Sequence, residues 1–311
     1  MGEAGPQLMS LTPLRQAGGD GGGHAASDGL YETPCPPQTR PVYGRGLRRG
    51  VSRAGNTDDA PEKPPYSPVI VATLHTLANP ARFLKIARPL TGIFLGLGIA
   101  LIVVAVWAGL VMTPPDYLQG ETVRILYIHV PAAWLGMGGW SGIALASLSL
   151  IVWRHPLAQV AGRAIAWPGA VFTALCLATG SIWGRPTWGT WWQWDGRLTS
   201  MLLLLFVYLG YIALARADAD RGGDGRIPAL YGLAGTALLP VIRYSVVWWN
   251  TLHQGQSIGL TGSSIDKSLL WPLPIAVGGF TFLFGAIVLM RMRTLLARAK
   301  AEARMRRMAR A

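Results

Sequence analysis

Six long runs of apolar residues follow a polar stretch at the start of the chain. These runs cover residues 90–113, 127–153, 166–183, 198–215, 228–247 and 269–290. A run of about 20 residues in a helix crosses the roughly 30 Å apolar core of a bilayer. A soluble protein would have to bury all of these nearly uncharged runs. The pattern therefore predicts an all-α polytopic membrane protein with six transmembrane helices.

The connections between the runs alternate in positive charge, which predicts their orientation. Basic residues precede the first run and follow the second, fourth and sixth: Arg82, Lys85 and Arg88; Arg154 and Arg163; Arg216, Arg221 and Arg226; and the tail from Arg291. The other connections, 114–126, 184–197 and 248–268, carry less net positive charge. Cytoplasmic loops are enriched in Lys and Arg, so we expect both termini to be cytoplasmic and these three connections to face outward.

Both ends of the chain differ from the predicted six-span domain, residues 69–290. Residues 1–68 are rich in Gly, Pro and polar side chains, and such a segment cannot bury enough apolar area to offset its ordering entropy. We expect a disordered extension, or a start codon assigned too early, with the true start near Val69 or Val71. Residues 291–311 carry seven Arg and one Lys against one Glu and hold about half of the net charge of +13. This basic cytoplasmic tail favours membrane lipid over nucleic acid as a partner.

Other classes of site find no support in the sequence. Cys35 lies in the polar stretch and Cys176 in an apolar run, so a disulfide framework is not expected. The chain contains no C-x-x-C-H motif for covalent c-type haem. Walker A patterns, serine-nucleophile motifs and paired intramembrane carboxylates are also missing from the sequence, which argues against ATP hydrolysis, acyl transfer and proton pumping.

The outward connection after the third run is rich in tryptophan. Five of the 12 residues from Trp183 to Trp194 are tryptophan. An interfacial aromatic belt is one interpretation, although a belt needs only one or two indoles per helix end. Indoles separated by Gly and Pro would also suit a flat, apolar, π-rich ligand. Arg185 and Arg197 flank the array and could pair with carboxylates on the ligand's edge. Haem combines such a plane with two propionates.

Two histidines add a candidate metal site. His129 in YIHVPAAW and His253 in WWNTLHQG lie at the outer ends of predicted spans. A single interfacial histidine is usually only a solvated polar residue, but ionisable groups at membrane depth are costly. Two histidines at matching depth, on either side of the tryptophan array, could supply both axial ligands to a haem iron. A zinc site would need more ligands.

These three motifs together resemble a known family. WGRPTWGTWWQWDGRLTS resembles the WWD signature of haem-handling membrane proteins, and the two histidine segments resemble those of the CcmC family of the cytochrome c maturation pathway. The resemblance extends from about Leu77 to Met290. It implies that His129 and His253 ligate haem iron from opposite faces. It also implies that the porphyrin edge is held by Trp183, Trp188, Trp191, Trp192, Trp194 and Asp195.

The resemblance further implies a function and a location. Such a protein binds haem b (iron protoporphyrin IX) at the outer face of the cytoplasmic (inner) membrane, with its WWD loop facing the periplasm. It delivers haem to the haem chaperone CcmE, and the ABC transporter CcmAB and the small protein CcmD are further implied partners. It is thus a haem-delivery or haem-attachment factor rather than a conventional enzyme.

Three alternative functions stay open at this stage. A cytochrome c synthase-type component of the same superfamily would be longer or have more spans. A haem transporter would need polar or broken helices at mid-membrane. A bis-histidine electron-transfer cytochrome would not need the tryptophan-rich connection.

Overall fold

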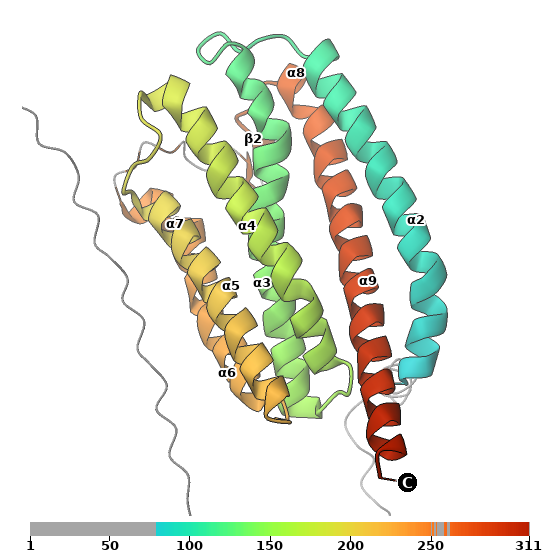
Figure 1. Ribbon diagram of the computed structural model, residues 1–311. Helices are drawn as coiled ribbons and strands as arrows, with labels where there is room; N and C mark the ends of the chain where they lie inside the picture. The colour runs from blue at the N-terminus through green and yellow to red at the C-terminus, as the bar shows by residue number, and fades with distance from the viewer. Residues whose placement is uncertain (1–78, 250, 252, 254–257, 260–261, 311) are drawn as a thin grey trace, which may run out of the picture. The chain divides into compact units, whose positions relative to one another are not determined.

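The computed structural model describes residues 79–249, 251, 253, 258–259 and 262–310 (Figure 1). Its elements are α2 (Pro80–Trp107), the π-helix η1 (Ala108–Met112), the 3-10 helix η2 (Glu121–Ile125), α3 (Leu126–Trp153), α4 (Ala158–Trp188), α5 (Gly196–Asp220), α6 (Arg226–Ala234), the 3-10 helix η3 (Gly235–Ala237), α7 (Leu238–Trp248), β1 (Ile258–Gly259), β2 (Gly262–Ser263), α8 (Lys267–Leu270) and α9 (Pro272–Met308). The two short strands pair antiparallel. The predictions for residues 1–68 and for Cys35 lie outside the described residues.

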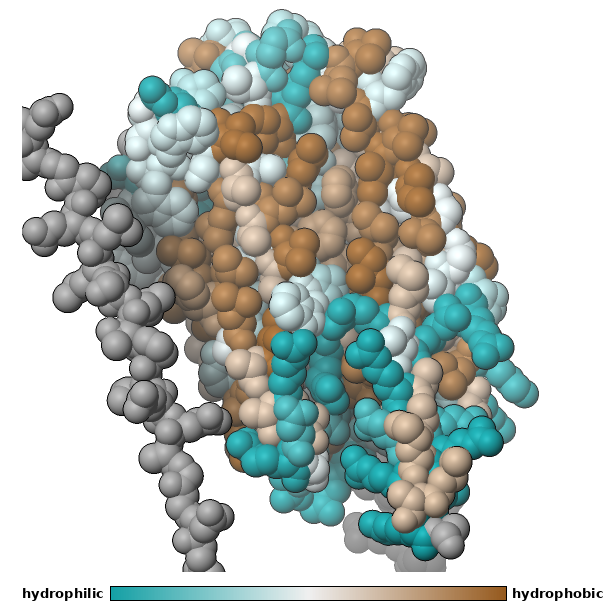
Figure 2. All heavy atoms as spheres, viewed as in Figure 1, coloured by the Kyte–Doolittle hydropathy of each residue, from teal (hydrophilic) through white to brown (hydrophobic). Residues whose placement is uncertain are grey.

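Six helical stretches in the described part of the chain are long and apolar enough to cross a membrane. They are Pro80–Met112, Glu121–Trp153, Ala158–Trp188, Gly196–Asp220, Arg226–Trp248 and Lys267–Met308. Figure 2 shows hydrophobic residues over the middle of the visible face and hydrophilic residues gathered at the end where the C-terminus lies. The prediction of an all-α polytopic membrane protein with six transmembrane helices is confirmed.

The connection after the third span is shorter than its apolar pattern suggested, because α4 continues to Trp188. Gly189 ends the helix with a φ of 77°, a left-handed conformation that glycine adopts at low cost. Its amide donates to the Arg185 carbonyl at 3.1 Å. Trp183 and Trp188 therefore lie on the last turns of a helix, and only residues 189–195 connect α4 to α5.

The basic tail begins as a direct continuation of the sixth span. The helix α9 continues without a break to Met308, so its helical structure does not change at residue 291. Met292 is buried against Leu157 and Ala164, and Arg291 Nε donates to the Ala164 carbonyl at 3.0 Å. The first turn of the tail is thereby attached to α4, and residues 297–310 are exposed.

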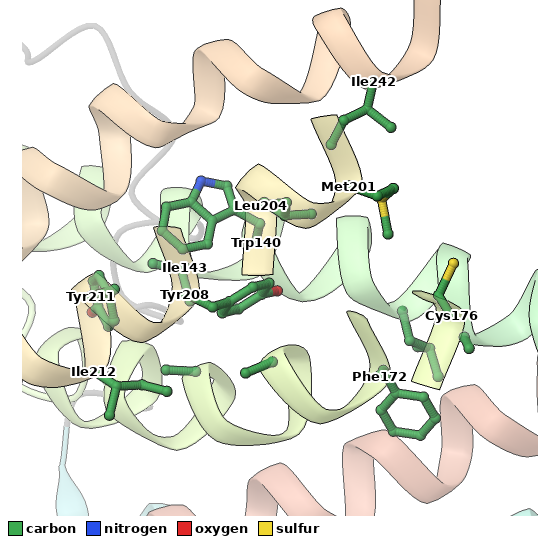
Figure 3. Close-up of a cluster of buried hydrophobic side chains, with 14 of the residues drawn as sticks. Trp140, Ile143, Phe172, Cys176, Met201, Leu204, Tyr208, Tyr211, Ile212 and Ile242 are labelled. Carbon is green, nitrogen blue, oxygen red and sulfur yellow. The ribbon is translucent and has the colours of Figure 1, made fainter. Parts of the chain in front are cut away.

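The centre of the bundle is a close-packed aromatic and aliphatic core between α3, α4 and α5 (Figure 3). Trp140 meets Tyr208 edge to face, with ring centres 4.9 Å apart, and Tyr208 donates its hydroxyl to the Gly136 carbonyl at 2.8 Å. Cys176 is a free, buried thiol in the same core. Helices in lipid associate through such close packing and interhelical hydrogen bonds. The core thus holds together the helices whose ends carry the candidate site.

The fifth span is interrupted between α6 and α7 by η3. Pro240, just after the interruption, has no amide hydrogen with which to continue the α-helical pattern. Beside the break lies the fully buried indole of Trp140, 6.5 Å from the ring of Tyr231 on α6. A broken helix is a feature of transporters, but here the break at Gly235 is packed by an aromatic and an aliphatic side chain, Trp140 and Val207.

Candidate functional site

A cavity of about 420 Å³ opens at the end of the bundle opposite the C-terminus. Its wall is formed by Leu118, Gln119, Thr122, His129, Gly180, Trp183, Pro186, Thr187, Trp188 and His253. The volume lies within the roughly 300–1,000 Å³ typical of sites for small molecules and cofactors. Both histidines and two of the tryptophans predicted from the sequence are in this wall.

The imidazole rings of the two histidines lie close together in the cavity wall. Their ring centres are 6.4 Å apart and the rings are tilted by 31°. His129 is buried in α3, whereas the half-buried His253 lies on the connection that follows α7. Each imidazole has an indole beside it: Trp183 meets His129 edge to face at 5.7 Å, and Trp188 lies 5.6 Å from His253. The fold therefore brings together two predicted ligands and two predicted stacking residues.

The hydrogen bonds around His129 indicate which ring nitrogen is free to bind a metal. His129 Nδ1 lies 3.1 Å from Thr179 Oγ1, and the Thr179 hydroxyl donates to the Leu175 carbonyl at 2.7 Å. Because a hydroxyl has one proton, we infer that Thr179 accepts from an Nδ1–H of His129. The lone pair of neutral His129 then lies on Nε2, as a metal ligand requires.

Close packing on α4 also places the imidazole of His129. A Cβ added at Gly180 would lie 3.0 Å from His129 Cε1. This separation is tighter than an ordinary van der Waals contact, so a larger residue at this position would displace the ring. Thr179 and Gly180 therefore form a surface on α4 that holds the imidazole ring of His129 in place.

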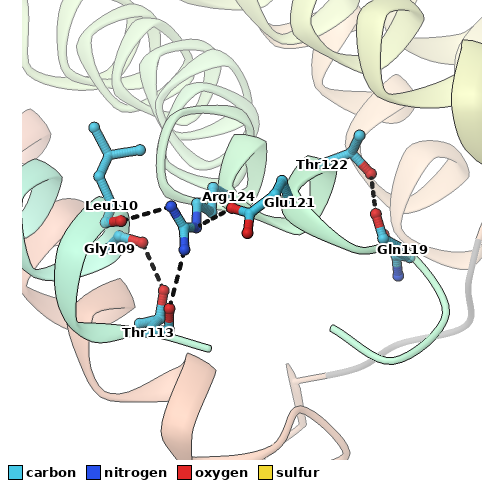
Figure 4. Close-up of polar contacts among 7 residues, drawn as sticks. All are labelled: Gly109, Leu110, Thr113, Gln119, Glu121, Thr122 and Arg124. Atoms are coloured by element: carbon cyan, nitrogen blue, oxygen red, sulfur yellow. Dashed lines mark hydrogen bonds and ion pairs between the residues drawn. The ribbon is translucent and has the colours of Figure 1, made fainter. Parts of the chain in front are cut away.

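Leu118, Gln119 and Thr122, on the connection between η1 and α3, line another part of the cavity, and Figure 4 shows polar contacts along this connection. Arg124 donates to the Leu110 carbonyl at 2.6 Å and forms an ion pair with Glu121 at 3.0 Å. The Thr122 hydroxyl donates to the Gln119 carbonyl at 2.7 Å. The Gln119 side chain in turn accepts from the Trp183 indole N–H at 2.7 Å, so this connection helps to orient an indole of the cavity wall.

The other predicted site residues lie outside the cavity wall. Trp191 and Trp194 are 58% and 74% exposed, and Trp194 packs edge-on against Trp192 at 5.4 Å. Arg185 is exposed and donates to the Gly189 carbonyl at the end of α4. Arg197 is half-buried on the first turn of α5, and Asp195 is the buried N-cap of that helix. The structure thus divides the predicted set into four cavity residues and six neighbours.

Several residues of the site were missed in the sequence, among them Gln119, Thr179 and Gly180. Thr179 and Gly180 precede Trp183 by four and three residues, which is the spacing of one helix face. The predicted third span, residues 166–183, already contained these two residues and Trp183, so helical spacing from Trp183 could have identified Thr179 and Gly180. Gln119 has no comparable signal, since its contact with Trp183 spans 64 residues of sequence.

Fold and site together define a multi-pass α-helical membrane protein with a histidine- and tryptophan-lined cavity at one end of its bundle. The family model described as CcmC, Heme exporter protein C, matches residues 73–307. The chain therefore belongs to the Heme exporter protein C family.

The regions that match individual relatives span most of the length of each relative. The chain is 48% identical over 222 residues to Heme exporter protein C of Bradyrhizobium diazoefficiens, covering 71% of this chain and 84% of that protein. It is 47% identical over 229 residues to Heme exporter protein C of Escherichia coli, covering 72% and 91%. A putative cytochrome c biosynthesis ccmC-like mitochondrial protein of Marchantia polymorpha is 37% identical over 220 residues, covering 71% and 94%.

Proposed function

We propose that this protein binds haem b between His129 and His253 at the periplasmic face of the cytoplasmic (inner) membrane and delivers it to the haem chaperone CcmE. Membership of the Heme exporter protein C family supports a haem-related role in cytochrome c maturation. The observation that carries the finer proposal is the pair of neighbouring imidazoles in the wall of a cavity that is also lined by indoles.

The distance between the imidazoles suits a single metal ion between them. An imidazole nitrogen binds a first-row metal at about 2.0–2.1 Å, so two imidazoles on opposite sides of one ion have ring centres roughly 6 Å apart. The ring centres of His129 and His253 are 6.4 Å apart. This spacing of the ring centres would allow both side chains to become axial ligands of one iron.

The small number of protein ligands favours porphyrin iron over a free metal ion. Among the described residues, no group of three or more His, Cys, Asp or Glu side chains could hold a metal. Zinc bound by protein alone normally takes three or four such ligands. Iron in haem needs only axial ligands from the protein, because the macrocycle supplies the rest. Trp183 and Trp188 provide the apolar aromatic surface that such a macrocycle requires.

Further haem contacts stay predictions. Arg185 and Arg197 do not line the cavity, so pairing with the propionates would take place at its margin. Three tryptophans, Trp191, Trp192 and Trp194, also lie outside the wall. Trp191 and Trp194 are exposed, which leaves them available to the protruding edge of a bound haem, to lipid or to a partner, whereas Trp192 is partly buried.

The distribution of charge supports the orientation in this proposal. The basic helix after Arg291 and the arginine-rich connections lie at the end opposite the cavity. Positive charge favours the cytoplasmic side, which leaves the cavity at the periplasmic face. Family membership supports association with other cytochrome c maturation components, and we propose CcmE, CcmAB and CcmD as these partners, with anionic lipid around the basic tail.

Haem transfer between purified proteins tests the proposed function. The full chain in detergent is loaded with haem, its absorption spectrum and pyridine haemochrome are recorded, and CcmE is added. We expect a low-spin bis-imidazole spectrum, followed by appearance of haem on CcmE. CcmE lacking its haem-binding histidine is the matched control. Failure of the purified chain to bind haem, or of haem to reach wild-type CcmE, would contradict the proposal.

Replacement of Thr179 by valine tests the ligand state of His129. Thr179→Val preserves the side-chain shape but removes the acceptor for Nδ1–H. We expect haem affinity to fall by about 10–100-fold, the usual cost of losing such a partner of a metal-binding histidine. Thr179→Ser should restore binding. Thr281→Val, which removes a similar helical hydroxyl bond on α9, should bind haem as wild type does, and equal binding by Thr179→Val would refute the role of Thr179.

A further inference from the structure

We propose that Asp195 is a positioning residue that holds His253 in the cavity through the hydroxyl of Thr251. The inference rests on the proposed function only in taking His253 as an axial ligand. It assigns to the aspartate of the tryptophan-rich segment a role different from direct contact with the porphyrin edge.

Asp195 uses both carboxylate oxygens within the protein. It is 6% exposed, and its Oδ1 accepts from the Leu198 amide at 2.7 Å, which caps the first turn of α5. Its Oδ2 accepts a short hydrogen bond from the hydroxyl of Thr251. One carboxylate therefore joins the start of α5 to the connection that follows α7.

The hydrogen bonds that join Asp195 to His253 through Thr251 form a relay, and the donor and acceptor roles are consistent along it. Thr251 has a single hydroxyl proton and donates it to Asp195. The same Oγ1 is an acceptor for the backbone amide of His253, at 3.0 Å. A carboxylate can only accept and an amide can only donate, so each group in the relay from Asp195 to His253 acts in its required sense.

A packing contact supports the same attachment. Trp249 lies against Gly196, where an added Cβ would come within 2.8 Å of Trp249 Cε3. The start of α5 and the end of α7 lie side by side in the bundle (Figure 1). Residues 195 and 196 thus contact Thr251 and Trp249, which both precede His253 in the chain.

Direct binding of the haem edge by Asp195 fits these observations less well. The carboxylate is buried and is not part of the cavity wall. Haem propionates are themselves negative and would be repelled by it. Placement of His253 is, in contrast, a task that needs such an anchor. His129 is part of the long helix α3 and contacts Thr179 on α4, whereas His253 lies outside regular secondary structure.

Hydrogen–deuterium exchange on the full-length protein without haem tests the relay. Thr251→Val retains the α5 cap but removes the hydroxyl that joins Asp195 to His253. We expect exchange in the peptide carrying Thr251 and His253 to increase at least about tenfold, with α3 and α4 peptides unchanged. Asp195→Ala should do the same, and Thr251→Ser should retain wild-type exchange. Unchanged exchange in Thr251→Val would overturn the inference, whatever the protein binds.

Haem binding provides the second measurement. We expect Thr251→Val and Asp195→Ala to bind haem about 10–100-fold more weakly and to lose the bis-imidazole spectrum. Added imidazole should restore this spectrum in both variants, because it replaces a displaced axial ligand. Loss of binding that imidazole does not restore would instead indicate contact between Asp195 and the porphyrin, and would overturn the positioning role. A wild-type protein that binds no haem would contradict the proposed function, while the exchange result would still decide the relay.

Asp266 offers a matched control on the same outward connection. It also caps a helix, accepting from the Ser268 amide at 2.8 Å, and the hydrogen bond from the Ser268 hydroxyl lowers the pKa of Asp266. Its carboxylate is exposed and outside the cavity wall. Asp266→Ala should therefore leave both the haem spectrum and exchange around His253 unchanged. If Asp266→Ala had an effect equal to that of Asp195→Ala, the effect would come from removing any helix cap. That result would overturn the proposed relay.

Discussion

Replacement of either His129 or His253 by alanine is expected to abolish the bis-imidazole absorption spectrum of the haem-loaded protein. The ring centres of the two histidines are 6.4 Å apart in the cavity wall, and neither variant can supply both axial ligands. Loss of a hydrogen-bond partner of a ligand costs about 10–100-fold in metal affinity, so loss of the ligand itself should cost at least about 100-fold. Spectral titration of purified variants with haem measures both effects.

The controls distinguish loss of a ligand from loss of folding. His155 lies at the other end of the bundle, where its Nδ1 accepts from the Leu157 amide, and His155→Ala should bind haem normally. Added imidazole should restore a low-spin spectrum to each single variant. A folded His129→Ala/His253→Ala double variant that retains the bis-imidazole spectrum would refute the ligand assignment.

Replacement of the two cavity tryptophans is expected to have the next largest effect. Trp183 and Trp188 line the cavity beside the two histidines. A stacked aromatic side chain contributes about 1–3 kcal/mol to binding a flat heteroaromatic ring, which corresponds to roughly 5- to 150-fold in affinity. We therefore expect Trp183→Ala and Trp188→Ala each to weaken haem binding by this factor, with phenylalanine restoring part of it.

Trp194 is the matched control for this comparison. It belongs to the same tryptophan-rich segment but is 74% exposed and outside the cavity wall. Trp194→Ala should change haem affinity by less than about threefold, a difference of under 1 kcal/mol. Similar losses at Trp194 and Trp188 would show that the whole array contributes equally, contrary to the division seen in the structure.

Much of the fold could be predicted because hydropathy directly reports the bilayer. The length of a helix that crosses the bilayer is enough to interpret the six apolar runs. The enrichment of positive charge on the cytoplasmic side is enough to interpret the alternating basic connections. Helix ends were predicted less well. The apolar run ended at residue 183, but Gly189 ends α4, because backbone conformation and not hydropathy decides where a helix stops.

The candidate site was predicted in part. His129, His253, Trp183 and Trp188 stood out by residue type and by their position at the outer ends of spans, and the structure brings all four to one cavity. The sequence could not separate these indoles from the exposed Trp191 and Trp194. All five share a segment and a residue type, and only the direction of each side chain on α4 or the following connection distinguishes them.

The sequence by itself determined the membrane class, the six spans and the residue types available for a flat ligand, because these depend on composition and local periodicity. Only the tertiary structure decided how those residues are used. The Thr179 hydroxyl beside His129, the Gln119 acceptor for Trp183 and the relay from Asp195 to His253 join segments 50 or more residues apart. Such contacts depend on which helix ends the packed core brings together, and no local pattern encodes that.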